Sequence, residues 1–159
     1  MVDIVFDGSI TLSQTSGVIG TTTNNNADAG SVGEYIESTG ALAANSNATS
    51  KNITSVECTA GDWELYGTGH FNKSAGTVMS QTILWISAFS ATLPGVTLRA
   101  ENRYSSTNPA SASSANISYT VPTARFSLSS TTTIYLSSYA AFTTSTLSSS
   151  GKLCARRVR

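Results

Sequence analysis

The chain has 159 residues, which is the size of one ordinary domain. Ser (27 residues) and Thr (23 residues) are abundant, and only 11% of the chain is charged, so it lacks the Glu, Lys and Arg that a coiled-coil or long-helix protein requires. Nine Lys and Arg balance nine Asp and Glu, and this zero net charge argues against the general basic field of a nucleic-acid-binding protein.

Residues 1–20 differ in pattern from the rest of the chain. The stretch Asp3-Ile4-Val5-Phe6-Asp7 predicts a short strand, followed by a turn at Gly8. Because an unpaired sheet edge is a liability, we expect this N-terminal arm to pair with an edge of its own subunit or of a neighbour. The start has neither the basic region nor the apolar region of a signal peptide. We therefore assign residues 1–20 to an arm or edge strand and residues 21–159 to one domain.

Apolar residues in the domain alternate with polar ones, and no window has the 3.6-residue period of a helix. The pattern predicts an all-β, single-domain antiparallel β-sandwich, similar to a jelly roll, with roughly eight strands. Polar loops are predicted at residues 21–30 and 105–115. The expected strands cover residues 32–38, 53–58, 63–71, 77–89, 96–104, 117–121, 125–128, 132–142 and 152–158.

The strand at residues 63–71 has the clearest alternation. Trp63 and Phe71 share a face with Leu65 and two glycines, so we expect both aromatic rings in the core. The glycines indicate close packing or a bulge, where a larger side chain would not fit. The opposite, polar face carries His70, which makes an exposed or hydrogen-bonded histidine the expected outcome.

The strand at residues 77–89 is apolar on both faces. Ile83 and Trp85 lie on one face, with Leu84 and Ile86 on the other. Such a strand is buried on both sides, in the centre of a sheet or at a subunit interface. Trp85 is therefore a candidate interface residue. The run of four apolar residues is far too short to cross a bilayer, so no membrane span is expected.

Enzyme chemistry finds little support in this sequence. His70 is the only histidine, and the nucleophile pattern Gly-x-Ser-x-Gly does not occur. Acid pairs such as Glu34 with Glu37 are expected by chance among nine acids. Cys58 and Cys154 have neither metal nor redox spacing, so we expect two free buried thiols, with a bridge between neighbouring strands as the alternative. We predict no enzyme activity, no cofactor and no metal.

Four of the nine cations fall in the last eight residues: Lys152, Arg156, Arg157 and Arg159. Interleaved aromatics and a broad basic patch are missing, so we predict no nucleic-acid partner. Arginines of this kind pair with carboxylates within a domain or across an oligomer interface. Arg156, Arg157 and Arg159 are therefore candidate interface residues, and the acids expected to face them are Glu34, Glu37, Glu57 and Glu64.

Three segments together resemble a known type of domain. Gly33-Glu34-Tyr35-Ile36 follows a Thr/Asn-rich lead. A second segment runs from Ile53-Thr54-Ser55-Val56 through residues 60–67, and a third from Thr132-Thr133-Ile134-Tyr135-Leu136 to the terminal Ala155-Arg156-Arg157-Val158-Arg159. This order is similar to that of a β-domain of tailed-bacteriophage virion proteins, of the tail-fibre-head or capsid-decoration type, and the resemblance covers roughly residues 20–159.

The resemblance implies a non-enzymatic bacteriophage structural protein on the exterior of the virion, made in the cytoplasm of the bacterial host. It implies a homotrimer that contacts other virion proteins, either the major capsid protein or tail proteins. Only about twenty residues precede the domain, where a fibre has a long shaft, which favours a capsid decoration (cement) protein. The alternative is the receptor-binding head of a tail fibre, which attaches to a host-surface glycan; this alternative gains if the chain is cut from a longer one.

Overall fold

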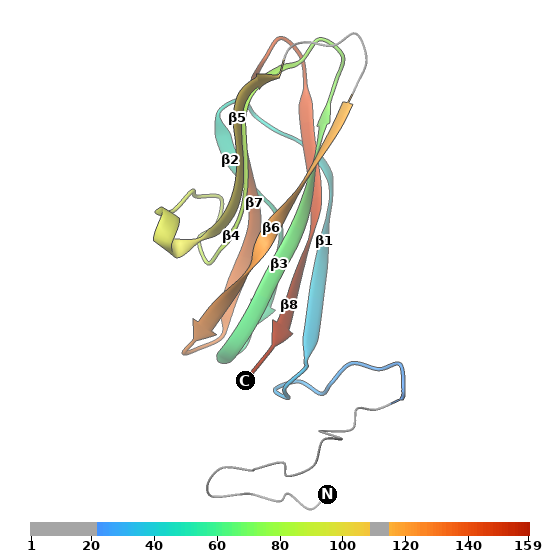
Figure 1. Cartoon of the computed structure of the whole chain (residues 1–159), viewed down its shortest axis with the longest axis vertical. Coiled ribbons are helices and arrows are strands. Elements are labelled where there is room, and N and C mark those ends of the chain that lie inside the picture. The colour runs from blue at the N-terminus through green and yellow to red at the C-terminus, as the bar shows by residue number, and fades with distance from the viewer. Residues whose placement is uncertain (1–21, 109–114) are drawn as a thin grey trace, which may run out of the picture.

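The computed structural model describes residues 22–108 and 115–159, so the predicted arm at residues 1–20 lies outside the described part. In this described part, eight strands form two four-stranded antiparallel sheets that face each other as a β-sandwich (Figure 1), which confirms the predicted fold class. The strands are β1 (Tyr35–Ala44), β2 (Thr49–Cys58), β3 (Gly61–Lys73), β4 (Val78–Ser87), β5 (Ala100–Asn108), β6 (Ala115–Leu128), β7 (Thr132–Thr143) and β8 (Leu147–Arg157).

The strand order is that of a jelly roll. One sheet has the order β1-β8-β3-β6 and the other β2-β7-β4-β5. The first strand thus pairs with the last, the second with the seventh, the third with the sixth, and the fourth with the fifth. This is the arrangement of one long hairpin wrapped around a core, as in double-sheet jelly rolls. Strands β1, β2, β5 and β6 are left at the sheet edges.

The predicted strands at 117–121 and 125–128 are one strand, β6, and this corrects the sequence-based boundary. Pro122 suggests a break, but β6 is an edge strand and bulges at this point: Val121 is opposite Gly67 and Ala124 is opposite Leu65. A proline is tolerated at such a place because its missing N–H leaves no partner unsatisfied. The loop predicted at 105–115 is also shorter than expected, since β5 continues to Asn108 and β6 begins at Ala115.

The prediction for residues 96–104 is corrected at its start. Residues Val96–Leu98 form a single 3-10 turn, and β5 begins only at Ala100. The whole connection from Ala88 to Arg99, here called the β4–β5 loop, projects from one side of the sandwich (Figure 1).

The core lies between the inner faces of the two sheets. Trp63 and Phe71 are completely buried, as the alternation predicts. The glycines of β3 do allow close packing: a Cβ on Gly69 would lie 2.6 Å from a methyl group of Leu84 in the opposite sheet. A second, smaller cluster surrounds Phe71, whose ring meets Tyr119 edge-on at 5.6 Å between ring centroids.

Strand β4 is buried on both faces, which confirms that prediction. It lies inside its sheet, between β7 and β5, and Trp85 on its outer face is 0% exposed. The β4–β5 loop is tied to β2 beyond β7: Asn52 Oδ1 accepts a hydrogen bond from the amide of Ala91 at 2.6 Å, and Asn52 Nδ2 donates to Ser90 Oγ at 2.8 Å. The chain itself therefore buries Trp85.

Candidate functional site

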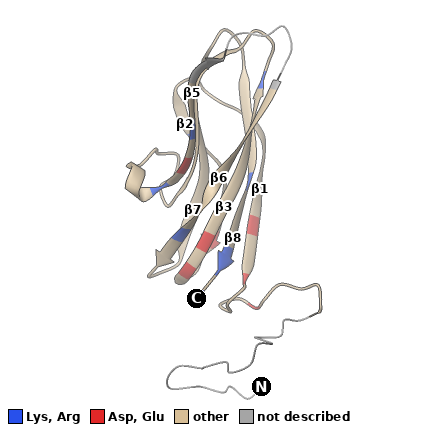
Figure 2. Cartoon of the chain, viewed as in Figure 1, with Lys and Arg blue, Asp and Glu red and all other residues tan. Residues whose placement is uncertain are grey.

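Charged residues gather at the end of the sandwich where β8 ends and β1 and β3 begin (Figure 2). This end is built from segments far apart in sequence, because the jelly-roll order places the last strand between the first and the third. The carbonyl of Arg157 accepts from the amide of Gly33, and the amide of Val158 donates to the carbonyl of Asp62. The C-terminal residues are thereby fixed on both sides by backbone hydrogen bonds.

Arg157 lies at the centre of a buried network. Its Nε donates to Glu34 Oε2 at 2.9 Å, and its Nη1 donates to the carbonyl of Ala60 at 2.8 Å. Its Nη2 donates to the hydroxyl of Thr59. The guanidinium carbon stands 4.4 Å from the centre of the Trp63 ring, within the range of a cation–π interaction. The predicted pairing of Glu34 with the arginine cluster is thus confirmed, within the domain.

Asp62 forms a second ion-pair cluster that the sequence reasoning missed. Its Oδ2 accepts from Arg125 Nη2 at 2.8 Å and from Arg159 Nη2 at 2.7 Å, and its side chain is only 4% exposed. Two arginines thus share one buried carboxylate. In the sequence, Asp62 is visible only as an acid next to Gly61 at the start of a predicted strand. This position does not reveal which arginine of another strand lies opposite Asp62.

The arginines stabilise the charged form of both carboxylates. Burial by itself raises the pKa of Glu34, but hydrogen bonds from the amide of Gly30 and from Arg157 lower it more, so its pKa lies below the usual value of 4.5. The pKa of Asp62 is lowered from 3.8 by a hydrogen bond with Ser127 and by Arg125. Both groups therefore remain charged at neutral pH.

The other predicted acids behave differently. Glu37 pairs with Lys152 at 2.7 Å on the outer face of the sheet and accepts a hydrogen bond from the hydroxyl of Tyr35, also at 2.7 Å. Within residues 22–108 and 115–159, neither Glu57 nor Glu64 forms an ion pair with Lys or Arg.

The four candidate interface residues divide into two groups. Arg156 and Arg159 are exposed, and Arg156 makes no ion pair with any acid in the described part of the chain. Arg157 is 4% exposed and Trp85 is 0% exposed, and both are enclosed by their own chain. As folded here, only Arg156 and Arg159 are accessible to a second subunit.

The remaining reactive side chains are placed as the sequence predicts. His70 is exposed, with Nδ1 2.7 Å from Ser118 Oγ. Cys58 and Cys154 are both free and buried, and burial raises the pKa of Cys58 to about 12. The described residues contain no group of three or more His, Cys, Asp or Glu side chains placed to hold a metal ion. Nor do they include any helix of the length and apolarity needed to cross a membrane.

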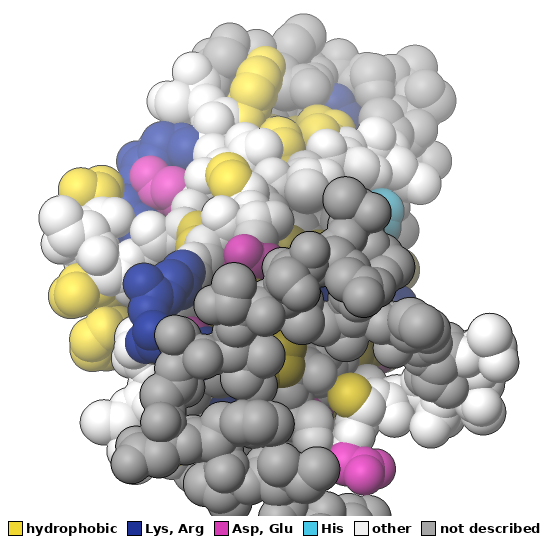
Figure 3. Space-filling view, turned by 60° about the horizontal axis from the view of Figure 1, so that its bottom comes forward, with side chains coloured by type: hydrophobic (Ala, Val, Ile, Leu, Met, Phe, Trp, Pro, Cys, Tyr) yellow, Lys and Arg dark blue, Asp and Glu magenta, His cyan; other side chains and the backbone are white. Residues whose placement is uncertain are grey.

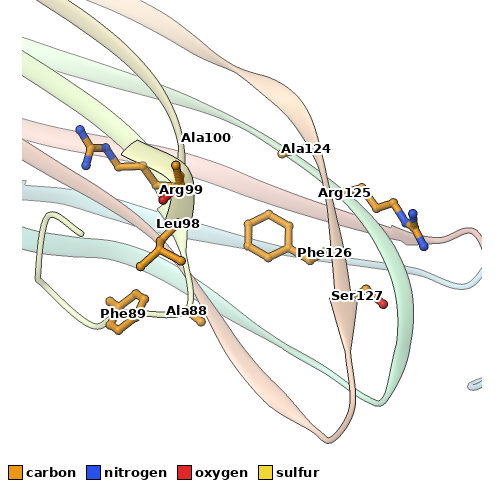
Figure 4. A pocket seen from close by; sticks show the side chains of 10 residues that line it. Ala88, Phe89, Leu98, Arg99, Ala100, Ala124, Arg125, Phe126 and Ser127 are labelled. Atoms are coloured by element: carbon orange, nitrogen blue, oxygen red, sulfur yellow. The ribbon is translucent and has the colours of Figure 1, made fainter. Parts of the chain in front are cut away.

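A groove of about 420 Å³ opens between the β4–β5 loop and the end of β6. In Figure 4 the ring of Phe126 projects into it from β6, toward Leu98 and Phe89 of the loop. The guanidinium groups of Arg99 and Arg125 point away from it on either side. We call this feature the loop groove. The sequence held no signal for it, because one wall is residues 88–100 and the other residues 124–127, which lie in distant parts of the chain.

No family model matches the chain, and no curated protein sequence is significantly similar to it. One similar solved structure is that of the infectious bursal disease virus Gx strain, with a TM-score of 0.48 and 14% sequence identity. The match covers 89% of this chain and 36% of that chain, so this chain spans about a third of the viral protein's length. A likeness at this TM-score does not assign a function.

Proposed function

We propose that this protein is a non-enzymatic structural component of the exterior of a tailed-bacteriophage virion, and that it is a trimeric capsid decoration protein. The observation that carries the proposal is the strand order β1-β8-β3-β6 over β2-β7-β4-β5. This is the double-sheet jelly roll, an architecture of viral capsid domains, although the fold also serves other functions. The sequence resemblance to tailed-phage β-domains supports the same assignment.

A non-enzymatic role agrees with what the charged groups do. The buried carboxylates Glu34 and Asp62 are held by arginines and have lowered pKa values. A carboxyl group that acts as a general acid or base at neutral pH works best when its pKa is raised toward the working pH. The pKa values of Glu34 and Asp62 are instead lowered. These networks fix the end of the sandwich and leave the outer surfaces for contacts with other virion proteins.

The copy number of the protein in purified particles tests this proposal. Quantitative mass spectrometry, with the major capsid protein as internal standard, should find hundreds of copies per particle. The labelled protein should also bind particles from which it is missing. Tens of copies or fewer would favour a tail component instead, and failure to find or bind the protein on particles would overturn a virion role.

The alternative is the receptor-binding head of a tail fibre. One observation favours it: the outer face of the β1-β8-β3-β6 sheet presents the exposed ring of Tyr66 near the polar cluster of Tyr35, Glu37 and Lys152. An aromatic ring beside hydrogen-bonding groups is suited to a sugar. Under this alternative, Tyr66→Ala abolishes binding of the protein to host cells and His70→Ala leaves it unchanged. Equal binding by wild type and Tyr66→Ala would remove the alternative.

A further inference from the structure

The loop groove is preformed, because both ends of the β4–β5 loop are fixed. Near its start, Asn52 holds Ser90 and Ala91. At its end, Arg99 Nε donates to Glu101 Oε2 at 2.7 Å, and the Arg99 side chain is only 4% exposed. The loop therefore keeps its distance from β6 without a ligand between them.

The walls of the groove are apolar and accessible. Phe89 is 45% exposed and Leu98 is 55% exposed, and Val96 on the same loop is 69% exposed. Figure 3 shows hydrophobic side chains gathered beside Lys and Arg side chains on this part of the surface. Among the described residues, the strands next to the groove, β5 and β6, are both edge strands, each paired on one side only. An exposed apolar groove between two open edges is suited to an extended segment of chain.

Arginines outnumber acids in the ion pairs on both sides of the groove. On the loop side, Arg99 and Arg103 share Glu101, at 2.7 Å and 3.5 Å. On the β6 side, Arg125 and Arg159 share Asp62, and the Arg125 and Arg159 side chains are 61% and 79% exposed. The exposed guanidiniums have donors left for further carboxylates. The matching ligand is a short apolar segment with an acid at each end.

The chain contains such a segment outside the described residues. Asp3-Ile4-Val5-Phe6-Asp7 has three apolar residues between two aspartates. We infer that the loop groove binds this segment from a second copy of the chain, with the side chains of Ile4 and Phe6 against Phe89, Leu98 and Phe126 and the aspartates at its two ends near the two arginine clusters. This inference goes beyond the proposed function, because the exchange between copies needs no virus particle.

The geometry favours a second copy over the chain's own segment. The described chain leads into β1, and β1 is the edge of its sheet opposite to β6. In Figure 1 residues 22–34, which precede β1, extend from the side of the sandwich away from the β4–β5 loop. Residues 1–21 span at most about 70 Å when extended, which is several times the radius of gyration of about 15 Å expected for a domain of this size. The segment is therefore long enough to reach the groove of a neighbour.

Cysteine cross-linking between separately made full-length chains tests the inference. One chain carries Phe6→Cys and the other Leu98→Cys; the native Cys58 and Cys154 are buried. Mild oxidation of the mixture should give a disulfide-linked dimer of the two chains. The matched control replaces Leu98→Cys by Val32→Cys, which alters an apolar residue that is also exposed, at 70%, beside β1. Asp3→Lys with Asp7→Lys in the first chain should lower the dimer yield about fivefold, the effect of about 1 kcal/mol of ion pairing.

Two results would overturn the inference. One is a dimer yield with Leu98→Cys no higher than with Val32→Cys. The other is a disulfide formed only within one chain when Phe6→Cys and Leu98→Cys are combined in the same polypeptide. Circular dichroism of each variant checks that the sandwich has formed. Because the experiment uses purified protein alone, its failure leaves the particle copy number, and so the proposed function, to be decided separately.

Discussion

Arg157 shows how one side chain connects three distant parts of the chain. It bonds Glu34 before β1 and the Thr59–Ala60 turn before β3, and its guanidinium covers the ring of Trp63. A buried ion pair adds little net stability when compared with a well-packed apolar pair. Removal of one partner is different, because the other charge is then left buried without compensation.

We predict that Arg157→Met lowers the free energy of unfolding by on the order of 3 kcal/mol, the cost of leaving Glu34 buried and unpaired. The control is Arg156→Met on the same strand, where the side chain is exposed and makes no ion pair in the described residues; its change should stay within about 0.5 kcal/mol. The double variant Glu34→Gln with Arg157→Met should regain part of the loss. Urea unfolding measures all three, and equal losses for the two single variants would contradict the ion-pair role.

Acid should weaken the domain through the same groups. The pKa values of Glu34 and Asp62 are lower in the folded chain than their usual 4.5 and 3.8. Their contribution to stability is therefore complete above those values and is lost as the pH falls through the folded-state pKa values. The urea midpoint should fall progressively below about pH 4.5. Asp62→Asn should show a flatter dependence, and a midpoint that rises on acidification would refute the assignment.

At the scale of elements, the two sheets approach closely because glycines lie on their inner faces. A Cβ on Gly151 of β8 would lie 2.5 Å from the carbonyl oxygen of Thr68 and 3.0 Å from a methyl group of Leu136. The first contact is with backbone, which cannot rotate away. Gly95 in the β4–β5 loop has a φ of −55° and nothing within 4 Å of such a Cβ, so it provides a matched control.

We predict that Gly151→Ala lowers the free energy of unfolding by about 1–3 kcal/mol, the usual cost of overpacking a core. Gly95→Ala should change it by no more than about 0.5 kcal/mol. Thermal and urea unfolding of the two variants measure the difference. A Gly151→Ala protein as stable as wild type would mean that β8 can shift relative to both the neighbouring strand β3 and Leu136 of the opposite sheet.

The predictability of each element from sequence depended on its surroundings. Strand β3 was predicted almost completely, because a strand with one face in the core alternates visibly. For β6 the local pattern predicts two strands, because Pro122 indicates a break, and only the bulge on this edge strand accommodates the proline. The turn at Val96–Leu98 was read as strand because its apolar residues, exposed in the fold, resemble core residues in a local pattern.

The charged site could be predicted only in part, for a reason of topology. The cluster of arginines at residues 156–159 and its candidate Glu34 are visible in the sequence. Which acid meets which arginine depends on how segments 63 to 123 residues apart are brought into register, and the local pattern therefore does not reveal Asp62. The loop groove is even harder to predict from the sequence, since its walls come from β6 and from the β4–β5 loop of the opposite sheet, and they meet only in the complete jelly roll.

At the scale of the whole molecule, the surface is suited to self-association. The net charge is zero, so copies do not repel each other at long range. Within residues 22–108 and 115–159, four strands lie at sheet edges, and apolar side chains are exposed on the β4–β5 loop. Because Trp85 and Arg157 are enclosed within one chain, we expect any contact between copies to use other surfaces, and we propose the loop groove.

We predict that the purified full-length protein forms a homotrimer of three times 16.5 kDa, as measured by sedimentation equilibrium or light scattering at micromolar concentration. If apolar contacts in the loop groove dominate the interface, the trimer should persist in 0.5 M salt. The Debye length is then about 4–5 Å, so the salt weakens only exposed ion pairs such as those of Arg159. The variant Leu98→Asp should dissociate the trimer, since it puts a charge among the apolar walls, whereas Val32→Asp should not. Trimers that dissociate in salt yet tolerate Leu98→Asp would instead indicate an interface formed by the exposed arginines.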